Sequence, residues 1–172
     1  MKRPKKTISQ IQDLPDTPAV YAMYAGKGKG LYCAYIGVAG KLKQRVLQHL
    51  VRRDSSVTTG ASAVVLRPEY ITEIRWWEHP DFSERHVLEA AELVAFDVLE
   101  PILRSRGAIQ EKSRQKYSDE AHWANMEALF QGEPSGRISL MTLQDAFERI
   151  GELERRVEEL EQLLRKDKGK GE

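Results

Sequence analysis

Residues 18–37 read PAVYAMYAGKGKGLYCAYIG, and this stretch decides the expected fold. Its two apolar runs, 18–24 and 31–37, are rich in Val, Tyr and Ile, which favour strands. The link between them, 25–30, is built of glycine and lysine, and glycine adopts turn dihedrals at no steric cost. The stretch therefore predicts a β-hairpin. The lysines of the link could alternatively reach a phosphate group.

The residues after this hairpin alternate between helical and extended patterns. Apolar spacing predicts a helix over 41–51, and β-branched and aromatic residues predict a third strand over 70–77. The sequence from Asp81 to Glu84 resembles a capping box, from which a long helix is expected to run to about Leu99. A short helix is expected over 118–130, after a polar segment that reads as loop. The fold class is α/β, of the α+β type: a small three-stranded, at least partly antiparallel sheet flanked by helices.

A different pattern follows the Gly- and Pro-rich break at 132–136. Apolar residues recur there at alternate spacings of three and four, which predicts a coiled-coil-like helix over 137–166. We expect it to form a homodimer through 143–164. The residues on the predicted seam are Leu143, Ala146, Ile150, Leu153, Val157, Leu160 and Leu164.

The residues beside the seam specify how two such helices would pair. Arg149 and Arg156 each precede a glutamate by five residues, so in a parallel pair each arginine faces a glutamate of the other helix. Phe147 and Leu163 flank the seam and instead favour extra packing or a higher-order bundle. A helix folded back on its own domain is the remaining alternative.

Composition describes a soluble globular protein with an uneven charge distribution. Residues 1–53 hold eleven lysines and arginines against two aspartates, a balance suited to a polyanion. No apolar run approaches the roughly 20 residues that span a bilayer. The basic N-terminus has no apolar segment behind it, and the single Cys33 fits a reducing cytoplasm, so we expect a cytoplasmic protein without a membrane partner.

These patterns divide the chain into five segments. They are a basic N-terminal arm (1–17), a core (18–104), a basic connector with a short helix (105–136), the heptad helix (137–166) and a tail (167–172).

Five residues of the core are of the types that phosphodiester cleavage needs. Tyr21 and Tyr35 lie on the two hairpin strands, where a phenol can position or deprotonate a water molecule. Arg45 and His49 lie four residues apart on one helical face, where a guanidinium pairs with phosphate oxygens. Glu92 interrupts an apolar stripe of the long helix, where a carboxylate favours a cation. The alternatives are half-buried aromatic residues, a solvated helix face and a carboxylate at the margin of the core.

The motif pair resembles that of the GIY-YIG nucleases. Residues 19–21 stand for the first motif, and residues 35–37 for the second. Arg45, His49 and Glu92 match the arginine, the His/Tyr position and the metal-binding glutamate of that family, and Pro101 follows Glu92 as its pattern expects. The resemblance implies a one-metal hydrolytic mechanism with Mg²⁺ or Mn²⁺ at Glu92.

In that family picture, Tyr21 and Tyr35 would place or deprotonate the water, Arg45 would hold the phosphate and His49 would assist proton transfer. The chain departs from the family pattern at three points. Ala19 replaces the usual glycine, the gap of 13 residues between the tyrosines is a little long, and Arg104 stands where the family has asparagine.

The sequence thus predicts a metal-dependent endonuclease that acts on DNA, with RNA not excluded. The alternative is a catalytically inactive nucleic-acid-binding or assembly protein that retains the fold. Basic side chains expected to contact nucleic acid are Lys41, Lys43, Arg52, Arg53, Arg104 and Arg106.

Overall fold

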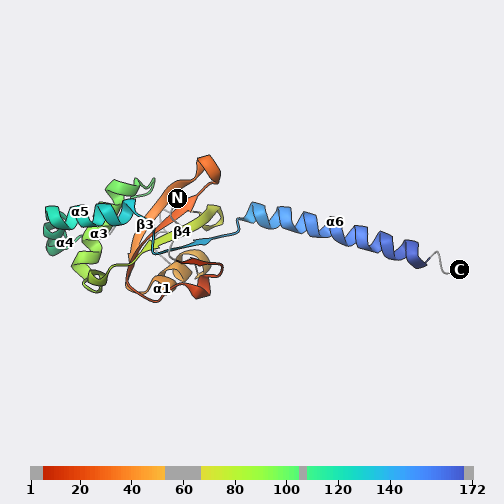
Figure 1. Ribbon diagram of the computed structural model, residues 1–172, viewed down its shortest axis with the longest axis horizontal. Coiled ribbons are helices and arrows are strands. Elements are labelled where there is room, and N and C mark those ends of the chain that lie inside the picture. The colour runs from red at the N-terminus through yellow and green to blue at the C-terminus, as the bar shows by residue number, and fades with distance from the viewer. Residues whose placement is uncertain (1–5, 53–66, 105–107, 169–172) are drawn as a thin grey trace. The chain divides into compact units, whose positions relative to one another are not determined.

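A computed structural model describes residues 6–52, 67–104 and 108–168 of the chain (Figure 1). The chain divides into two compact units, Met1–Leu140 and Met141–Glu172. The first unit combines a mixed β-sheet with helices that flank it. The second consists, in its described part, chiefly of one long helix, α6 (Leu143–Lys168). The predicted α+β class is confirmed.

The described part of the chain forms a five-stranded sheet, so the prediction of three strands was wrong. Both strands of the predicted hairpin and the third predicted strand are present. The strand order is β1-β5-β4-β2-β3, and all neighbours are antiparallel except the parallel pair β1 and β5. The bounds are β1 Thr7–Ile8, β2 Ala19–Ala25, β3 Tyr32–Ala39, β4 Ile71–Trp77 and β5 Gly136–Ser139.

The two strands that the sequence did not predict lie together at one side of the sheet. β1 has two residues and lies in the expected basic arm, whereas β5 has four and lies where a break and the start of the heptad helix were expected. Strands this short show no readable alternation of apolar and polar residues. β5 instead owes its place to β4, where Ile138 pairs with Ile74 and Gly136 with Trp76.

Both faces of the sheet are covered, which explains why every residue of β2, an inner strand between β4 and β3, is buried. One face packs against α1 (Leu42–Leu47), and the other against α3 (Arg85–Leu99) and α5 (Glu120–Gln131) (Figure 1). Successive side chains of a strand point to opposite faces. Tyr21 and Met23 therefore join the core under α1, whereas Val20 and Ala22 join the core under α3.

The helices depart from expectation at two places. α3 begins at Arg85, because Asp81 lies in a short 3₁₀ turn (Pro80–Ser83) and no side chain caps the helix, so the predicted capping box is wrong. The polar segment expected to be a loop contains α4 (Glu111–Tyr117), which packs against α3. α4 is tied to α3 by a hydrogen bond of 2.8 Å from Ser113 Oγ to Glu89 Oε2, a long-range contact that the local sequence does not reveal.

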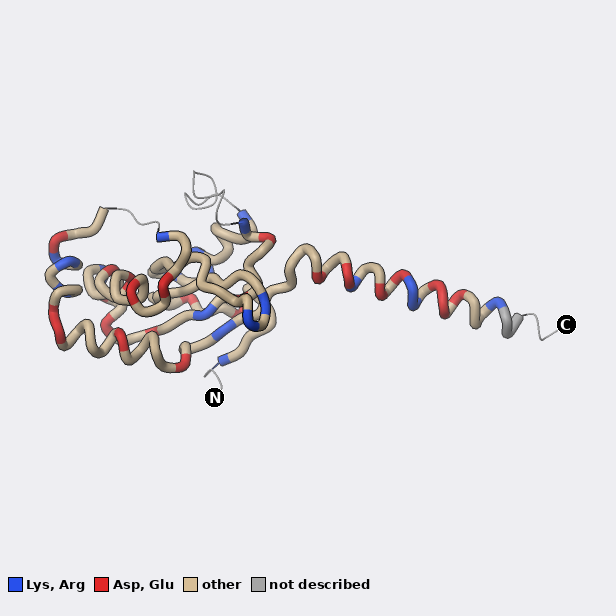
Figure 2. The backbone as a smooth tube through the Cα atoms, turned by 90° about the horizontal axis from the view of Figure 1, so that it is seen from above, with Lys and Arg blue, Asp and Glu red and all other residues tan. Residues whose placement is uncertain are grey.

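The second unit starts with a reciprocal cap. Thr142 Oγ1 accepts from the Asp145 amide at 3.2 Å, and Asp145 Oδ2 accepts from the Thr142 amide at 2.9 Å, which fixes where α6 begins. Acidic and basic residues follow one another along the whole described helix (Figure 2). The helix predicted over 137–166 is present, but it begins at Leu143 because 136–139 form β5, and the described residues show no coiled coil. Across the three described ranges, no helix has both the length and the apolar character that crossing a membrane requires.

Candidate active site

Two tyrosine hydroxyl groups converge above Gly37, on the sheet face that α1 covers. Tyr21 pairs with Gly37 across the β2–β3 ladder, and Tyr35 precedes Gly37 by two residues, so both side chains stand on the glycine's face. A Cβ atom on Gly37 would lie 2.6 Å from Tyr21 Oη and 2.8 Å from Tyr35 Oη. Both distances are below any normal contact. Position 37 thus requires glycine, because any side chain there would occupy the space in which the two hydroxyl groups lie.

The imidazole of His49 completes an aromatic triangle with these phenols. Tyr21 Oη lies 2.6 Å from His49 Nε2, within hydrogen-bonding distance. The ring centroids are 6.1 Å apart for Tyr21 and Tyr35, and His49 lies 5.8 Å from Tyr21 and 5.6 Å from Tyr35. Tyr21 and His49 are fully buried and Tyr35 nearly so. The structure therefore brings together three of the five predicted site residues in direct contact.

The chain entering α1 positions His49. The Leu42 and Lys43 amides donate to the carbonyls of Thr17 and Pro15, at 3.2 and 3.1 Å, which anchors the start of the helix. After Leu47 the backbone widens into a π-helical turn, Gln48–Arg52, and His49 lies in it. π-helical turns are rare and frequently mark functional sites. The predicted helix 41–51 is thus two helical segments, with the imidazole at the change of geometry.

Arg45 lies one helical turn before His49 and is half-buried. Its Nη1 donates to Gln48 Oε1 at 3.2 Å, which holds the side chain along the helix. The guanidinium charge lowers the pKa values of Tyr21, Tyr35 and His49 alike, although burial has the larger effect on each. A single cation that acts on all three groups must lie close to all three, so Arg45 belongs to the same site.

Burial keeps all three titratable rings neutral near pH 7. Burial raises the pKa of Tyr21 well above its usual range, and Tyr35 raises it further. Burial also raises the pKa of Tyr35. Burial, followed by the charge of Arg45, lowers the pKa of His49 from 6.5 to about 4. A neutral imidazole can accept a proton, and a neutral phenol beside it can donate one.

Glu92 lies on α3, the helix that covers the face of the sheet opposite to the two phenols. It is half-buried on α3, and after α3 the chain returns along the edge of the sheet, where Leu103 bridges to Tyr35. Its charge is the second-largest cause, after burial, of the raised pKa of Tyr35. Glu92 therefore interacts electrostatically with Tyr35.

Glu89 has a structural role. Its carboxylate accepts from Arg85 Nε at 2.6 Å and from Ser113 Oγ at 2.8 Å, and its side chain is only 13% exposed. Despite burial, which opposes it, the hydrogen bonds from Arg85 and Ser113 lower its pKa. Glu89 thus joins α3 to α4.

A hard divalent cation at this site would be held mainly by water and substrate. Within the described residues, no three His, Cys, Asp or Glu side chains form a metal-binding group, so a caged ion is not built here. Magnesium is commonly bound by one or two carboxylates together with substrate phosphate and water. In that mode, Glu92 would be the protein ligand for Mg²⁺ or Mn²⁺.

The basic residues predicted to contact nucleic acid are distributed unevenly around this site. Lys41 and Arg52 are exposed at the two ends of the α1 segment, and Lys43 is half-exposed between them. Arg104 is exposed. Its Nη2 donates to the Phe96 carbonyl at 3.1 Å, and its Nη1 forms an ion pair with Asp97 Oδ1 at 3.8 Å. Arg53 and Arg106 lie outside the described residues.

Gly37 is the functional position that the sequence reasoning missed as a site residue. The signal was available, since a glycine stands two residues after a tyrosine in a strand where glycine is unfavourable.

Comparison of the whole chain with family models, curated proteins and solved structures found no match.

Proposed function

We propose that the protein is a metal-dependent endonuclease that hydrolyses phosphodiester bonds in DNA, in the manner of the GIY-YIG nucleases. One observation carries the proposal: two phenols and a neutral imidazole meet over Gly37, within the electrostatic reach of Arg45 and Glu92. Each chemical part of phosphodiester hydrolysis has a candidate group in this cluster.

The hydrogen bond between Tyr21 and His49 supplies a route for the proton of the attacking water. Tyr21 Oη takes a proton from water as its own proton passes to His49 Nε2, so the phenol is neutral before and after the transfer. The hydroxide oxygen then forms a bond to phosphorus, and the bond to the leaving oxygen breaks. Tyr35, on the other side of Gly37, orients the water.

Substrate binding makes His49 a better base. Part of the reason for its low pKa of about 4 is the charge of Arg45. Arg45 pairs with oxygens of the scissile phosphate, and this compensates its charge and raises the proton affinity of His49. Glu92 would hold the divalent cation, which would supply charge neutralisation during cleavage.

DNA is the proposed partner of the core, and a second copy of the chain is the proposed partner of α6. Lys41, Lys43 and Arg52 surround the α1 segment with positive charge, which suits a phosphate backbone. Apolar side chains along α6 are about half exposed in the single chain, which favours a helix pair, a homodimer through 143–164.

The test is cleavage of supercoiled plasmid DNA with Mg²⁺ by the intact protein and by single variants. Glu92→Gln, Arg45→Ala and Tyr21→Phe are each expected to lower the cleavage rate by at least about 100-fold, since each removes a group that acts in the transition state. Glu89→Gln is the matched control, because it changes a carboxylate on the same helix that contacts Arg85 and Ser113.

Equal rates for wild type and Glu92→Gln would overturn the site assignment. Absence of cleavage by wild type with Mg²⁺ and with Mn²⁺, alongside salt-sensitive DNA binding, would indicate a non-catalytic binding protein that retains the fold.

A further inference from the structure

We infer that two copies of α6 pair in parallel, and that this pairing tethers two cores to one DNA duplex so that both strands are cut in one encounter. The inference rests on the proposed function for its second half. The first half, the parallel pair, depends only on α6 and is tested separately.

The apolar seam of α6 is exposed in the single chain. Its large side chains range from 46% exposed at Leu153 to 63% at Leu164. They recur at alternate spacings of three and four through a helix of 26 residues, so they form one stripe along its length. A stripe of this kind is stabilised by burial against a second apolar stripe, and an identical helix offers one with the same spacing.

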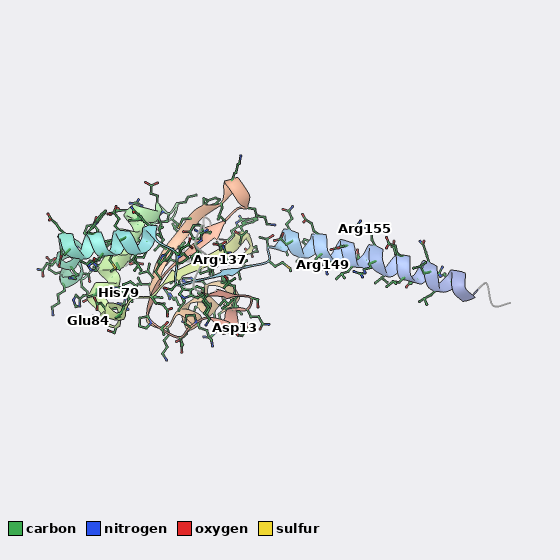
Figure 3. All side chains as sticks on the ribbon, in the orientation of Figure 1. Asp13, His79, Glu84, Arg137, Arg149 and Arg155 are labelled. Atoms are coloured by element: carbon green, nitrogen blue, oxygen red, sulfur yellow. The ribbon has the colours of Figure 1, made fainter. Side chains whose placement is uncertain are left out.

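Charge decides the orientation of that second helix. The residues flanking the seam on one side include Arg149 and Arg156, and those on the other side include Glu154 and Glu161. A parallel pair places each arginine against the partner's glutamate five residues on, giving four attractive contacts. An antiparallel pair places arginine near arginine and glutamate near glutamate. Arg149 lies exposed on α6 (Figure 3), and among the described residues it forms an ion pair with Glu152 of the same helix, a partner it can exchange for a glutamate of a second helix.

A parallel pair brings the two cores together. The first unit ends at Leu140 and α6 begins at Leu143, so each core is joined by two residues to the N-terminal end of its helix. Parallel helices put these ends side by side, whereas antiparallel helices would separate them by roughly 40 Å, the length of 26 residues. Tethering of this kind gives the second core an effective concentration of about a millimolar at the first core's DNA.

Cysteine cross-linking tests the orientation. Leu143→Cys and Leu164→Cys each place a thiol at one end of the seam, and the native Cys33 is buried in the core. In the parallel pair, each variant forms a disulfide with itself under oxidised glutathione. Cross-linking only when the two variants are mixed would establish an antiparallel pair and overturn the inference. Sedimentation equilibrium is expected to show a dimer, and a monomer or a larger assembly would overturn it equally.

Charge reversal tests the contacts that flank the seam. The variant R149E/R156E and the variant E154R/E161R are each expected to lose about 100-fold or more in dimer affinity, because four attractive contacts become repulsive. An equimolar mixture restores four attractive contacts in a heterodimer. Retention of full dimer affinity by either variant alone would contradict the charge argument.

The same heterodimer tests coupled cutting. We expect wild type and the mixed heterodimer to convert supercoiled plasmid to linear DNA with little nicked intermediate. Adding Glu92→Gln to one of the two reversed chains should halt the mixture at nicked circles. A dimer that releases nicked circles with both sites intact would overturn the coupling. A dimer that cuts nothing would overturn the proposed function and leave the helix pairing standing.

Discussion

At the residue scale, the site depends on a position without a side chain. Gly37 leaves space for Tyr21 Oη and Tyr35 Oη, and no other residue type could occupy the strand there without moving a phenol. The positions of the two tyrosine hydroxyl groups therefore depend on the absence of a side chain at Gly37. Burial then sets the protonation of all three rings.

Gly37→Ala is expected to displace at least one phenol. Overpacking of a well-packed core costs about 1–3 kcal/mol, and the same displacement is expected to lower plasmid cleavage by at least about 100-fold. Gly40→Ala is the matched control, since a Cβ atom at Gly40 would meet nothing within 4 Å. Urea denaturation and cleavage are measured on both variants. Equal cleavage by Gly37→Ala and Gly40→Ala would show that the tyrosines do not depend on the absence of a side chain at position 37.

His49 is expected to make stability depend on pH. Its pKa falls from 6.5 to about 4 on folding, so between these pH values the unfolded chain binds a proton that the folded protein does not. The free energy of unfolding should therefore decrease as pH falls through this window, by about 3 kcal/mol in total, and be unaffected above it. Urea denaturation at pH 7, 6 and 5 is compared for wild type and His49→Gln. Parallel pH curves for the two proteins would contradict the expectation.

At the element scale, short strands are held in place by their neighbours. β5 has four residues, yet it forms antiparallel pairs with β4 and a parallel pair with β1. Gly136 permits this, because the Trp76 ring covers it and a Cβ atom there would lie 2.1 Å from Trp76 Cζ2.

Gly136→Ala is accordingly expected to loosen β5 from the sheet. The fully buried Trp76 ring cannot move without disturbing the core, so we expect a loss of about 1–3 kcal/mol in the free energy of unfolding. The exposed Ser139→Ala, at the other end of the same strand, is the control. Denaturation followed by tryptophan fluorescence measures both. A stability change of the same size in the two variants would argue against the close contact.

At the scale of the whole molecule, the chain divides into two compact units to which the proposals assign different roles. The core up to Leu140 carries the proposed chemistry, and α6 carries the proposed pairing. A protein truncated after Leu140 is expected to unfold at the temperature of the full-length core transition and to cleave short DNA duplexes at an undiminished rate, but as a monomer. Calorimetry, sedimentation and duplex cleavage check these three outcomes. Loss of duplex cleavage in a folded truncated protein would favour an assembly role for the chain.

The sequence by itself determined the elements with strong local signals. The hairpin, the strand ending at Trp77, the long helix ending at Leu99 and α6 all have periodic apolar patterns of sufficient length. The same patterns placed Tyr21, Tyr35, Arg45 and His49 on neighbouring elements. Glu92 was identified because burial of an unpaired carboxylate in an apolar stripe is energetically unfavourable.

Only the tertiary structure decided what depends on contacts between distant residues. β1 and β5 form a strand pair between segments that are far apart in the sequence. Thr7 pairs with Arg137, 130 positions later. Burial likewise sets the protonation of His49. The hydrogen bond from Ser113 to Glu89 and the electrostatic effect of Glu92 on Tyr35 both join residues far apart in the sequence. Local sequence encodes backbone preference and amphipathic pattern. Desolvation and long-range pairing exist only once the chain has folded.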